Sequence, residues 1–206
     1  MMRTGGYSTF IMDQRGGVAV EFVALLPAFV FLTFFVFEIT IAVLWVGTVE
    51  KAAQLGARLA IVSDLAVTGL SPDLKNGVAD GHIPGDHCDQ GGCTIFAPRT
   101  CTGGSIGECS VGFTAIFSRM DAIATLLQPE NVTITYAYVG LGFAGGPIVP
   151  RVTVTIQNVP YDTFMTNILA RFMRLATGDP AAVSPLTILP TIAVTLTGED
   201  LDTGVS

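Results

Sequence analysis

The sequence predicts an α+β fold in which one long N-terminal helix crosses a membrane and continues into a small domain. Three observations predict it. Phe22 to Val46 is an apolar run of 25 residues with one charge, Glu38. Thr48 to Ser63 keeps apolar residues at helical spacing, and three later segments alternate as strands do. We therefore expect an antiparallel sheet of about three strands with one or two packing helices.

The apolar run has the length of a transmembrane helix. A bilayer core requires about 20 apolar residues in helical form. The hydrophobic part of a secretory signal has about 7–15 residues and ends at a small-residue cleavage site. This run is longer, and no Ala-x-Ala pattern follows it. It therefore predicts a transmembrane helix over residues 17–46, in preference to a cleaved signal or a buried core helix.

The charge of the chain excludes one class of partner. The net charge is -7, and from Gly47 onward 14 acidic residues stand against 8 basic ones. Nucleic-acid binding requires a basic face, and a polybasic grip on anionic lipid requires a cluster of Lys and Arg. We expect no nucleic acid as partner, and a membrane contact made by the apolar run.

Flanking charges leave the orientation of this helix open. Arg3 and Arg15 precede the apolar run, whereas Lys51 and Arg58 follow it. The positive-inside rule counts these residues, and the two sides are equal. The direction of the helix must therefore be inferred from other features.

The segment RGGVAVEFVALLP, residues 15–27, carries a recognisable motif. It resembles the G/xxxxEF processing site of type IV prepilins in its Flp-pilus form. With the Phe- and Leu-rich run that follows, it is more narrowly similar to the TadE-like pseudopilins of tight-adherence systems. That resemblance implies a leader, residues 1–16, on the cytoplasmic side, and a C-terminal domain in the periplasm of a bacterium with the helix in the inner membrane.

The resemblance also assigns roles to individual residues. Cleavage by a membrane aspartyl prepilin peptidase would fall between Gly16 and Gly17, which makes Gly17 the new N-terminus. Glu21 then becomes the fifth residue, the pilin-type glutamate, and Phe22 is the aromatic residue after it. A second glycine at Gly17 leaves the scissile bond open, although the spacing to Glu21 favours the bond after Gly16. The implied partners are the peptidase, other pilin-like subunits, the Flp pilus assembly machinery and inner-membrane lipid.

The chemistry of these residue types suits such a role. Glycine lets the backbone enter a narrow protease cleft without a side-chain clash. Removal of the leader would create an ammonium group at Gly17, which Glu21 of a neighbouring subunit is suited to neutralise, because unpaired buried charges are costly. Without the resemblance, Glu21 would be interpreted as a surface acid in a first helical turn, favoured by the helix dipole.

Glu38 is an intramembrane carboxylate without an assigned role. A charge at the centre of a membrane helix costs about 2.5–3.5 kcal/mol on insertion scales. Three interpretations stay open: a pair with another subunit, a protein-facing stripe shared with Thr33 and Thr40, or tolerance through helix tilt and local hydration.

All four cysteines, Cys88, Cys93, Cys101 and Cys109, fall in a segment rich in turn residues, 64–112. An even number of clustered cysteines favours two disulfides in an oxidising compartment, with three possible connectivities. Zinc bound by Cys88, Cys93, His82 and His87 is an alternative, but the cysteine spacings beyond the first pair do not fit a zinc ribbon. Free thiols are a third possibility. Disulfides would place this segment in the periplasm.

The last part of the chain predicts the remaining elements. Helices are expected over Phe113–Gln128 and within Tyr161–Ala176, where Phe164, Ile168, Phe172 and Leu175 have helical spacing. Strands are expected over Asn131–Val139, Val149–Val159 and Thr191–Thr197. Gly140, Gly142 and Gly145 match G-x-G-x-x-G in outline, but a strand follows them, so we interpret them as a hairpin loop and not as a dinucleotide site.

These observations predict a structural or assembly protein. Its expected parts are a leader (1–16), a transmembrane helix (17–46), a helix extension (47–63), a cysteine-containing loop region (64–112) and a periplasmic α+β domain (113–206). No catalytic motif, metal site or cofactor is predicted. The resemblance favours a pseudopilin or minor pilin-like subunit in Flp pilus assembly. The alternative is an unprocessed, membrane-tethered periplasmic binding module; an exported enzyme, a third class, lacks a site.

Overall fold

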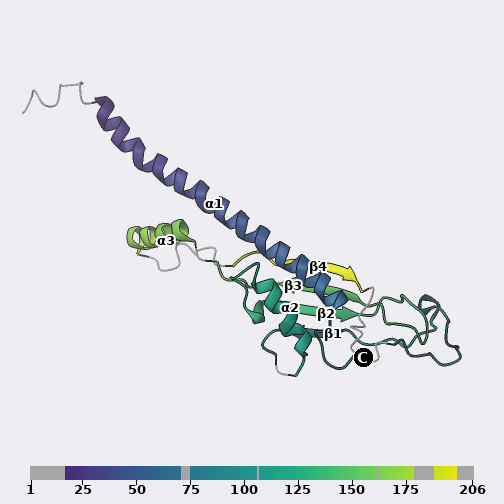
Figure 1. Cartoon of the computed structure of the whole chain (residues 1–206). Coiled ribbons are helices and arrows are strands. Elements are labelled where there is room, and N and C mark those ends of the chain that lie inside the picture. Colours follow the sequence, from purple (N-terminus) through teal and green to yellow (C-terminus); the bar gives the residue numbers. More distant parts are fainter. Residues whose placement is uncertain (1–16, 71–74, 106, 162, 179–187, 199–206) are drawn as a thin grey trace, which may run out of the picture. The chain divides into compact units, whose positions relative to one another are not determined.

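The computed structural model describes residues 17–70, 75–105, 107–161, 163–178 and 188–198. The elements along the chain are α1 (Gly17–Val62), η2 (Cys88–Gln90), β1 (Arg99–Thr102), α2 (Val111–Asp121), η3 (Pro129–Asn131), β2 (Val132–Ala137), β3 (Arg151–Ile156), α3 (Phe164–Thr177) and β4 (Ile192–Thr197) (Figure 1). The predicted α+β class is confirmed. The chain divides into two compact units: one contains α1 up to Ala42 together with α3, and the other contains the rest of α1 and the sheet.

The predicted long helix is a single element. α1 has 46 residues and includes Pro27, so it is about 70 Å long at 1.5 Å per residue. Pro27 has no N–H to donate to the carbonyl of Val23, four residues earlier, so one helical hydrogen bond is missing there. The helix continues past the apolar run and ends at Val62, one residue before the predicted end. Ser63 donates both its N–H and its hydroxyl to the carbonyl of Leu59, at 2.9 and 2.6 Å.

The sheet has four antiparallel strands in the order β1-β2-β3-β4. β2, β3 and β4 lie within the three predicted segments, and a fourth strand, β1, lies inside the segment interpreted as loop. Its sequence RTCT holds one apolar residue, Cys101, between a proline and two glycines. Such a strand is too short to show an alternating pattern, and its pairing with β2 is a tertiary contact.

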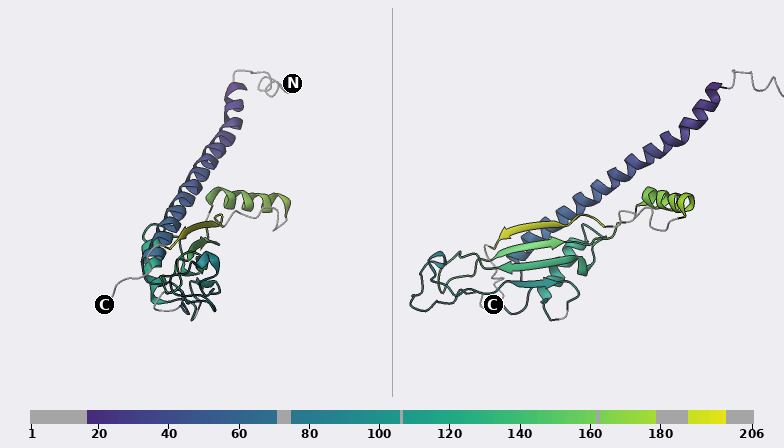
Figure 2. Two further views of the ribbon diagram at one scale, coloured as in Figure 1. Left: turned by 90° about the vertical axis from the view of Figure 1, so that its right-hand side faces the viewer. Right: turned by 180° about the vertical axis from the view of Figure 1, so that it is seen from behind.

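One face of the sheet is the core of its unit. Alternate side chains of β2 and β3 are fully buried there, and those of β4 are half-buried. In Figure 1 α1 and α2 lie in front of this face, and in the reverse view of Figure 2 the strands lie in front of both helices. The buried residues are Val132, Ile134, Tyr136, Val152, Val154 and Ile156 from the strands, and Phe113, Ile116 and Met120 from α2.

The other face of the sheet is rich in threonine. Thr100–Thr135, Thr102–Thr133 and Thr153–Thr195 form cross-strand hydroxyl pairs at 3.2, 3.1 and 3.0 Å. Such pairs each stabilise a sheet by a few tenths of a kcal/mol to about 1 kcal/mol. They join β1 to β2 and β3 to β4, so this polar face supports the register that the buried face requires.

α2 ends earlier than its sequence predicts. It begins at Val111 after the N-cap Ser110, whose side chain accepts from Gly112 N–H at 3.2 Å. The predicted end at Gln128 was wrong, because the helix stops at Asp121. Pro129 disfavours helical backbone at the residue before it, and Gln128 is indeed extended, with φ -111° and ψ 151°.

Candidate functional site in the N-terminal helix

α1 begins at Gly17, the first described residue, whereas Gly16 lies outside the described residues. Glu21 is therefore four residues into the helix, one turn beyond Gly17 and on the same face. It does not lie in the first turn, where the helix dipole acts most strongly. Glu21 and Phe22 are both exposed, and the side chain of Phe22 is 64% accessible. Gly17, Glu21 and Phe22 thus lie in the first part of α1 that the structure describes, and all three are exposed.

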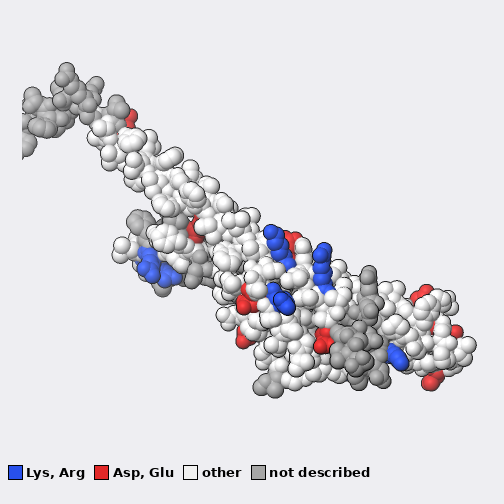
Figure 3. Space-filling view, in the orientation of Figure 1, with Lys and Arg blue, Asp and Glu red and all other residues white. Residues whose placement is uncertain are grey.

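The helix beyond this end is apolar on all sides. Its large side chains are 40–70% exposed, and in Figure 3 this stretch carries few coloured atoms. These residues are Val20, Phe22, Val23, Leu25, Leu26, Phe29, Val30, Phe31, Leu32, Phe34, Phe35, Val36, Phe37, Ile39, Ile41, Val43 and Leu44. Among the described residues, α1 is the one helix long and apolar enough to cross a membrane. An all-round apolar surface suits lipid or neighbouring helices, and not water.

The apolar surface gives way to a packed one within about one turn. Residues 45–48 are half-buried, Val49 is fully buried, and Glu50 and Lys51 are exposed. Trp45 lies at this boundary, and tryptophan is enriched where a transmembrane helix meets the membrane–water interface. The end of the transmembrane segment at Val46 stays a prediction.

Glu38 does not share a face with Thr33 and Thr40. Glu38 is two residues from Thr40, which is about 160° away around a helix with 3.6 residues per turn. The two threonine hydroxyls donate to carbonyls of their own helix, Thr33 to Phe29 and Thr40 to Val36, both at 2.9 Å. The interpretation of a common polar stripe was therefore wrong. Glu38 is half-buried among exposed neighbours.

The structure pairs all four cysteines, as Cys88–Cys93 and Cys101–Cys109, with Cα–Cα distances of 4.7 and 4.9 Å. Both bridges are local and close loops of few residues. Because each sulfur is bonded to another sulfur, none is a thiolate that could bind zinc. The histidines of the zinc alternative have other neighbours: His82 Nδ1 is 3.0 Å from Asp86 Oδ2, and the His87 ring lies 4.7 Å from that of Phe143.

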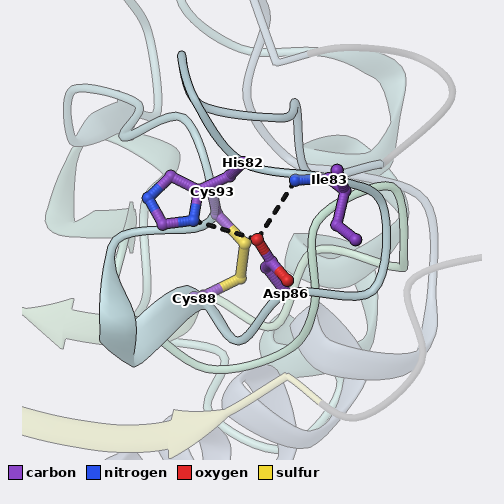
Figure 4. A network of polar contacts seen from close by, with 5 residues as sticks. All are labelled: His82, Ile83, Asp86, Cys88 and Cys93. Carbon is purple, nitrogen blue, oxygen red and sulfur yellow. Dashed lines mark hydrogen bonds and ion pairs between the residues drawn. A yellow bond between two sulfur atoms is a disulfide. The ribbon is translucent and has the colours of Figure 1, made fainter.

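Asp86 is the centre of a small polar network beside the first disulfide (Figure 4). Its carboxylate accepts from Ile83 N–H at 3.1 Å and lies 3.0 Å from His82 Nδ1. The hydrogen bond from Ile83, then that from His82, hold the pKa of Asp86 below its ordinary value. The network fixes the turn before Cys88 and brings no third metal-binding group to the site.

The glycine-rich loop packs against this turn. Asn76, which is buried, donates its side-chain amide to the carbonyls of Phe143 and Pro147 at 3.3 and 3.0 Å. Gly142 has φ +96°, and a side chain there would approach this amide closely. The glycines therefore serve a packed turn between β2 and β3, in agreement with the predicted loop.

A shallow hollow lies next to the Cys88–Cys93 bridge, with a volume of about 960 Å³. Its polar lining includes Asp89, Thr94 and Tyr138, but the Tyr138 hydroxyl already donates to the carbonyl of Cys88 at 3.3 Å. No set of three metal-ligating side chains gathers anywhere in the described residues. The hollow offers little convergent chemistry for the alternative of a binding module.

The sequence did not predict the residues that attach the end of α1 to the sheet. Tyr136 is fully buried; its hydroxyl donates to the carbonyl of Ala60 at 3.0 Å and accepts from Ala66 N–H at 3.4 Å. Ala60 is among the last four residues of α1, whose carbonyls have no partner within the helix. Burial raises the pKa of Tyr136 to about 12. The run of small residues Ala52, Ala53, Gly56 and Ala57 was the available signal for close packing here.

Comparison with known proteins identifies the N-terminal part. A family model described as TadE-like protein matches residues 16–58, about a fifth of the chain. The predicted resemblance is confirmed over this segment, which extends into the packed part of α1. The match associates the chain with the pilin-like, structural proteins of tight-adherence pilus systems. No curated protein and no solved structure matched the chain.

Proposed function

We propose that the chain is a pseudopilin or minor pilin-like subunit that takes part in assembly of a Flp tight-adherence pilus. In this proposal a prepilin peptidase removes residues 1–16 by cleaving after Gly16. The observation that most supports it is the uncovered apolar surface of α1 over the described residues, together with the spacing of one helical turn from Gly17 to Glu21.

Cleavage would change the chemistry at the start of α1. The new ammonium group at Gly17 would be a positive charge at the end of an apolar helix. Glu21 of an adjacent subunit could neutralise it when the two helices lie side by side with the correct offset. A mismatched offset would leave two unpaired charges in a medium of low dielectric constant, which costs several kcal/mol. The pair would therefore select one register between subunits.

The direction of the chain through the membrane follows from the same proposal. Gly16 must face a peptidase on the cytoplasmic side, so the unit with the sheet would lie in the periplasm. The two disulfides support this assignment, because disulfides persist in oxidising compartments and are rare in the cytosol. The inner membrane would hold the subunit until it joins the assembly machinery.

The decisive experiment is the mature N-terminus. The protein purified from membranes of cells that make the pilus should begin at Gly17, as measured by mass spectrometry of the intact chain. Gly16→Ala should leave the leader attached, whereas Gly17→Ala, the matched control, should still be cleaved if the bond after Gly16 is the scissile one. A chain that keeps residues 1–16 in these cells would contradict the proposal and favour the unprocessed binding module.

A further inference from the structure

α3 exposes an apolar stripe. Phe164, Ile168 and Leu175 are 69, 43 and 85% accessible, whereas Ala170, on another side of the helix, is 3% accessible. At 100° per residue the three large side chains lie within about 40° of one another around the helix. An amphipathic helix normally buries such a stripe. This one leaves it without cover from the described residues.

Charge on α3 is of one sign. Arg171 and Arg174 are exposed and are the charged residues of its sequence, FMTNILARFMRLAT, while the nearest acids, Asp162 and Asp179, lie outside its bounds. Viewed along the helix, Arg171 lies about 20° and Arg174 about 80° from Phe164, on the side away from Ile168. The arginines therefore border the apolar stripe. Figure 3 shows this basic patch on α3, in a chain whose net charge is -7.

α3 follows β3 in the chain after a short connection, which limits how far α3 can lie from the end of that strand. Tyr136, late in β2, contacts Ala60 near the end of α1. β3 runs antiparallel to β2 and finishes at Ile156 opposite Val132, so it points back toward the entry of α1, as Figure 2 also shows. α3 starts eight residues after Ile156, a distance that an extended chain covers in at most about 28 Å.

We propose that α3 lies flat in the surface of the bilayer that α1 crosses. Its apolar stripe would enter the acyl region, and Arg171 and Arg174 would pair with lipid phosphates. Fourteen residues give a helix of about 21 Å, too short to span a core of about 30 Å. Arginine at the border of the stripe suits an interface, because its stem covers apolar surface while the guanidinium group reaches the headgroups.

The charge of α3 favours lipid over another copy of the chain's apolar helix. The exposed apolar part of α1 offers few counter-charges, whereas anionic headgroups are negative and dense. Two arginines are fewer than a polybasic cluster, so the apolar stripe supplies most of the binding and the charges direct it to anionic lipid. α1 alone permits rotation about its own axis, and a second membrane contact through α3 would restrict that rotation.

The test uses the full chain reconstituted in phosphatidylcholine vesicles with and without phosphatidylglycerol. An environment-sensitive fluorophore is attached at Ile168→Cys and, as the matched control, at Asn167→Cys, with the native cysteines kept as disulfides. We expect lipids that carry a quencher at a shallow acyl position to quench the label at residue 168 and much less at 167, which aqueous iodide should reach. Phosphatidylglycerol should increase the difference.

A second experiment tests the role of the two arginines. Arg171→Gln with Arg174→Gln should lower the ratio of inserted to water-exposed label at residue 168 about thirty-fold in anionic vesicles, with an unchanged melting temperature as evidence of folding. Equal access of iodide to both labels would overturn the proposal. Insertion that does not depend on the arginines or on anionic lipid would overturn the phosphate pairing. Protection that appears only at high protein density would assign the stripe to a second copy and also overturn it.

Discussion

Up to Leu44, α1 carries large apolar side chains that are exposed on every side, whereas from Val49 to Ala60 its buried positions are mostly alanine. The backbone conformation is the same in both halves. The first half has large apolar side chains on its surface, which favours contact with lipid or other helices. The second half has small side chains at its buried positions, so the sheet and a second helix can approach its backbone closely. Side-chain size, and not helicity, separates a membrane surface from a domain core in this molecule.

The largest difference is expected between two glycines of α1, Gly56 in the packed half and Gly47 just before it. A side chain at Gly56 would collide with buried Met120, whereas nothing lies within 4 Å of the position at Gly47. Gly56→Leu should lower the free energy of unfolding by about 3 kcal/mol. Gly47→Leu should raise it by up to about 0.8 kcal/mol through helix propensity. Urea titration in detergent, followed by circular dichroism, measures both; equal effects would refute the contrast.

Removal of a disulfide should affect the packed unit and leave the apolar half of α1 unchanged. Cys101→Ala with Cys109→Ala opens a loop of sequence separation 8, for which the loop-entropy model predicts a loss of about 2.5 kcal/mol. The bridge Cys88–Cys93, with a separation of 5, should contribute roughly 2 kcal/mol on the same model. Thermal unfolding of the two double variants shows which disulfide contributes more to stability. A larger effect for Cys88–Cys93 would contradict it.

Loss of the Tyr136 hydroxyl should loosen the end of α1 from the sheet. Tyr136→Phe leaves the Ala60 carbonyl and the Ala66 N–H without this partner, which should cost about 1–2 kcal/mol. Ala137→Ser, on the neighbouring, half-buried position of β2, is a control expected to have a small effect. Hydrogen exchange of the amides in the last turns of α1 should increase in Tyr136→Phe and remain unchanged in the control.

The raised pKa of Tyr136 also predicts that the folded state loses stability at alkaline pH. Its pKa is raised from 10.0 to about 12, so the folded state holds the proton more tightly than the unfolded state. The resulting stability is complete below pH 10 and is lost as pH rises through about 12. Tyr136→Phe should remove this part of the pH dependence between pH 10 and 12. An unchanged alkaline profile would show that other groups cause it.

The smallest effect is expected at Asp86, whose carboxylate is exposed. Its pKa is lowered by Ile83 N–H and His82, so its contribution is present above the ordinary pKa and disappears as pH falls through the folded value. Asp86→Asn should therefore weaken the Cys88 turn slightly at neutral pH and make no difference in strong acid. Chemical shifts of the Ile83 amide as a function of pH measure this directly.

The sequence by itself determined the long helix, the fold class and the motif at residues 15–27, because hydrophobic length, periodicity and motif spacing are local properties. It also indicated the cysteines as bridges, although their connectivity needed the distances. Only the tertiary structure decided that β1 is a strand, that Tyr136 anchors Ala60, and that α3 leaves an apolar stripe uncovered. These features depend on contacts between residues far apart in the chain. A four-residue strand or an uncovered helix face has no local pattern that distinguishes it from a loop or a core helix.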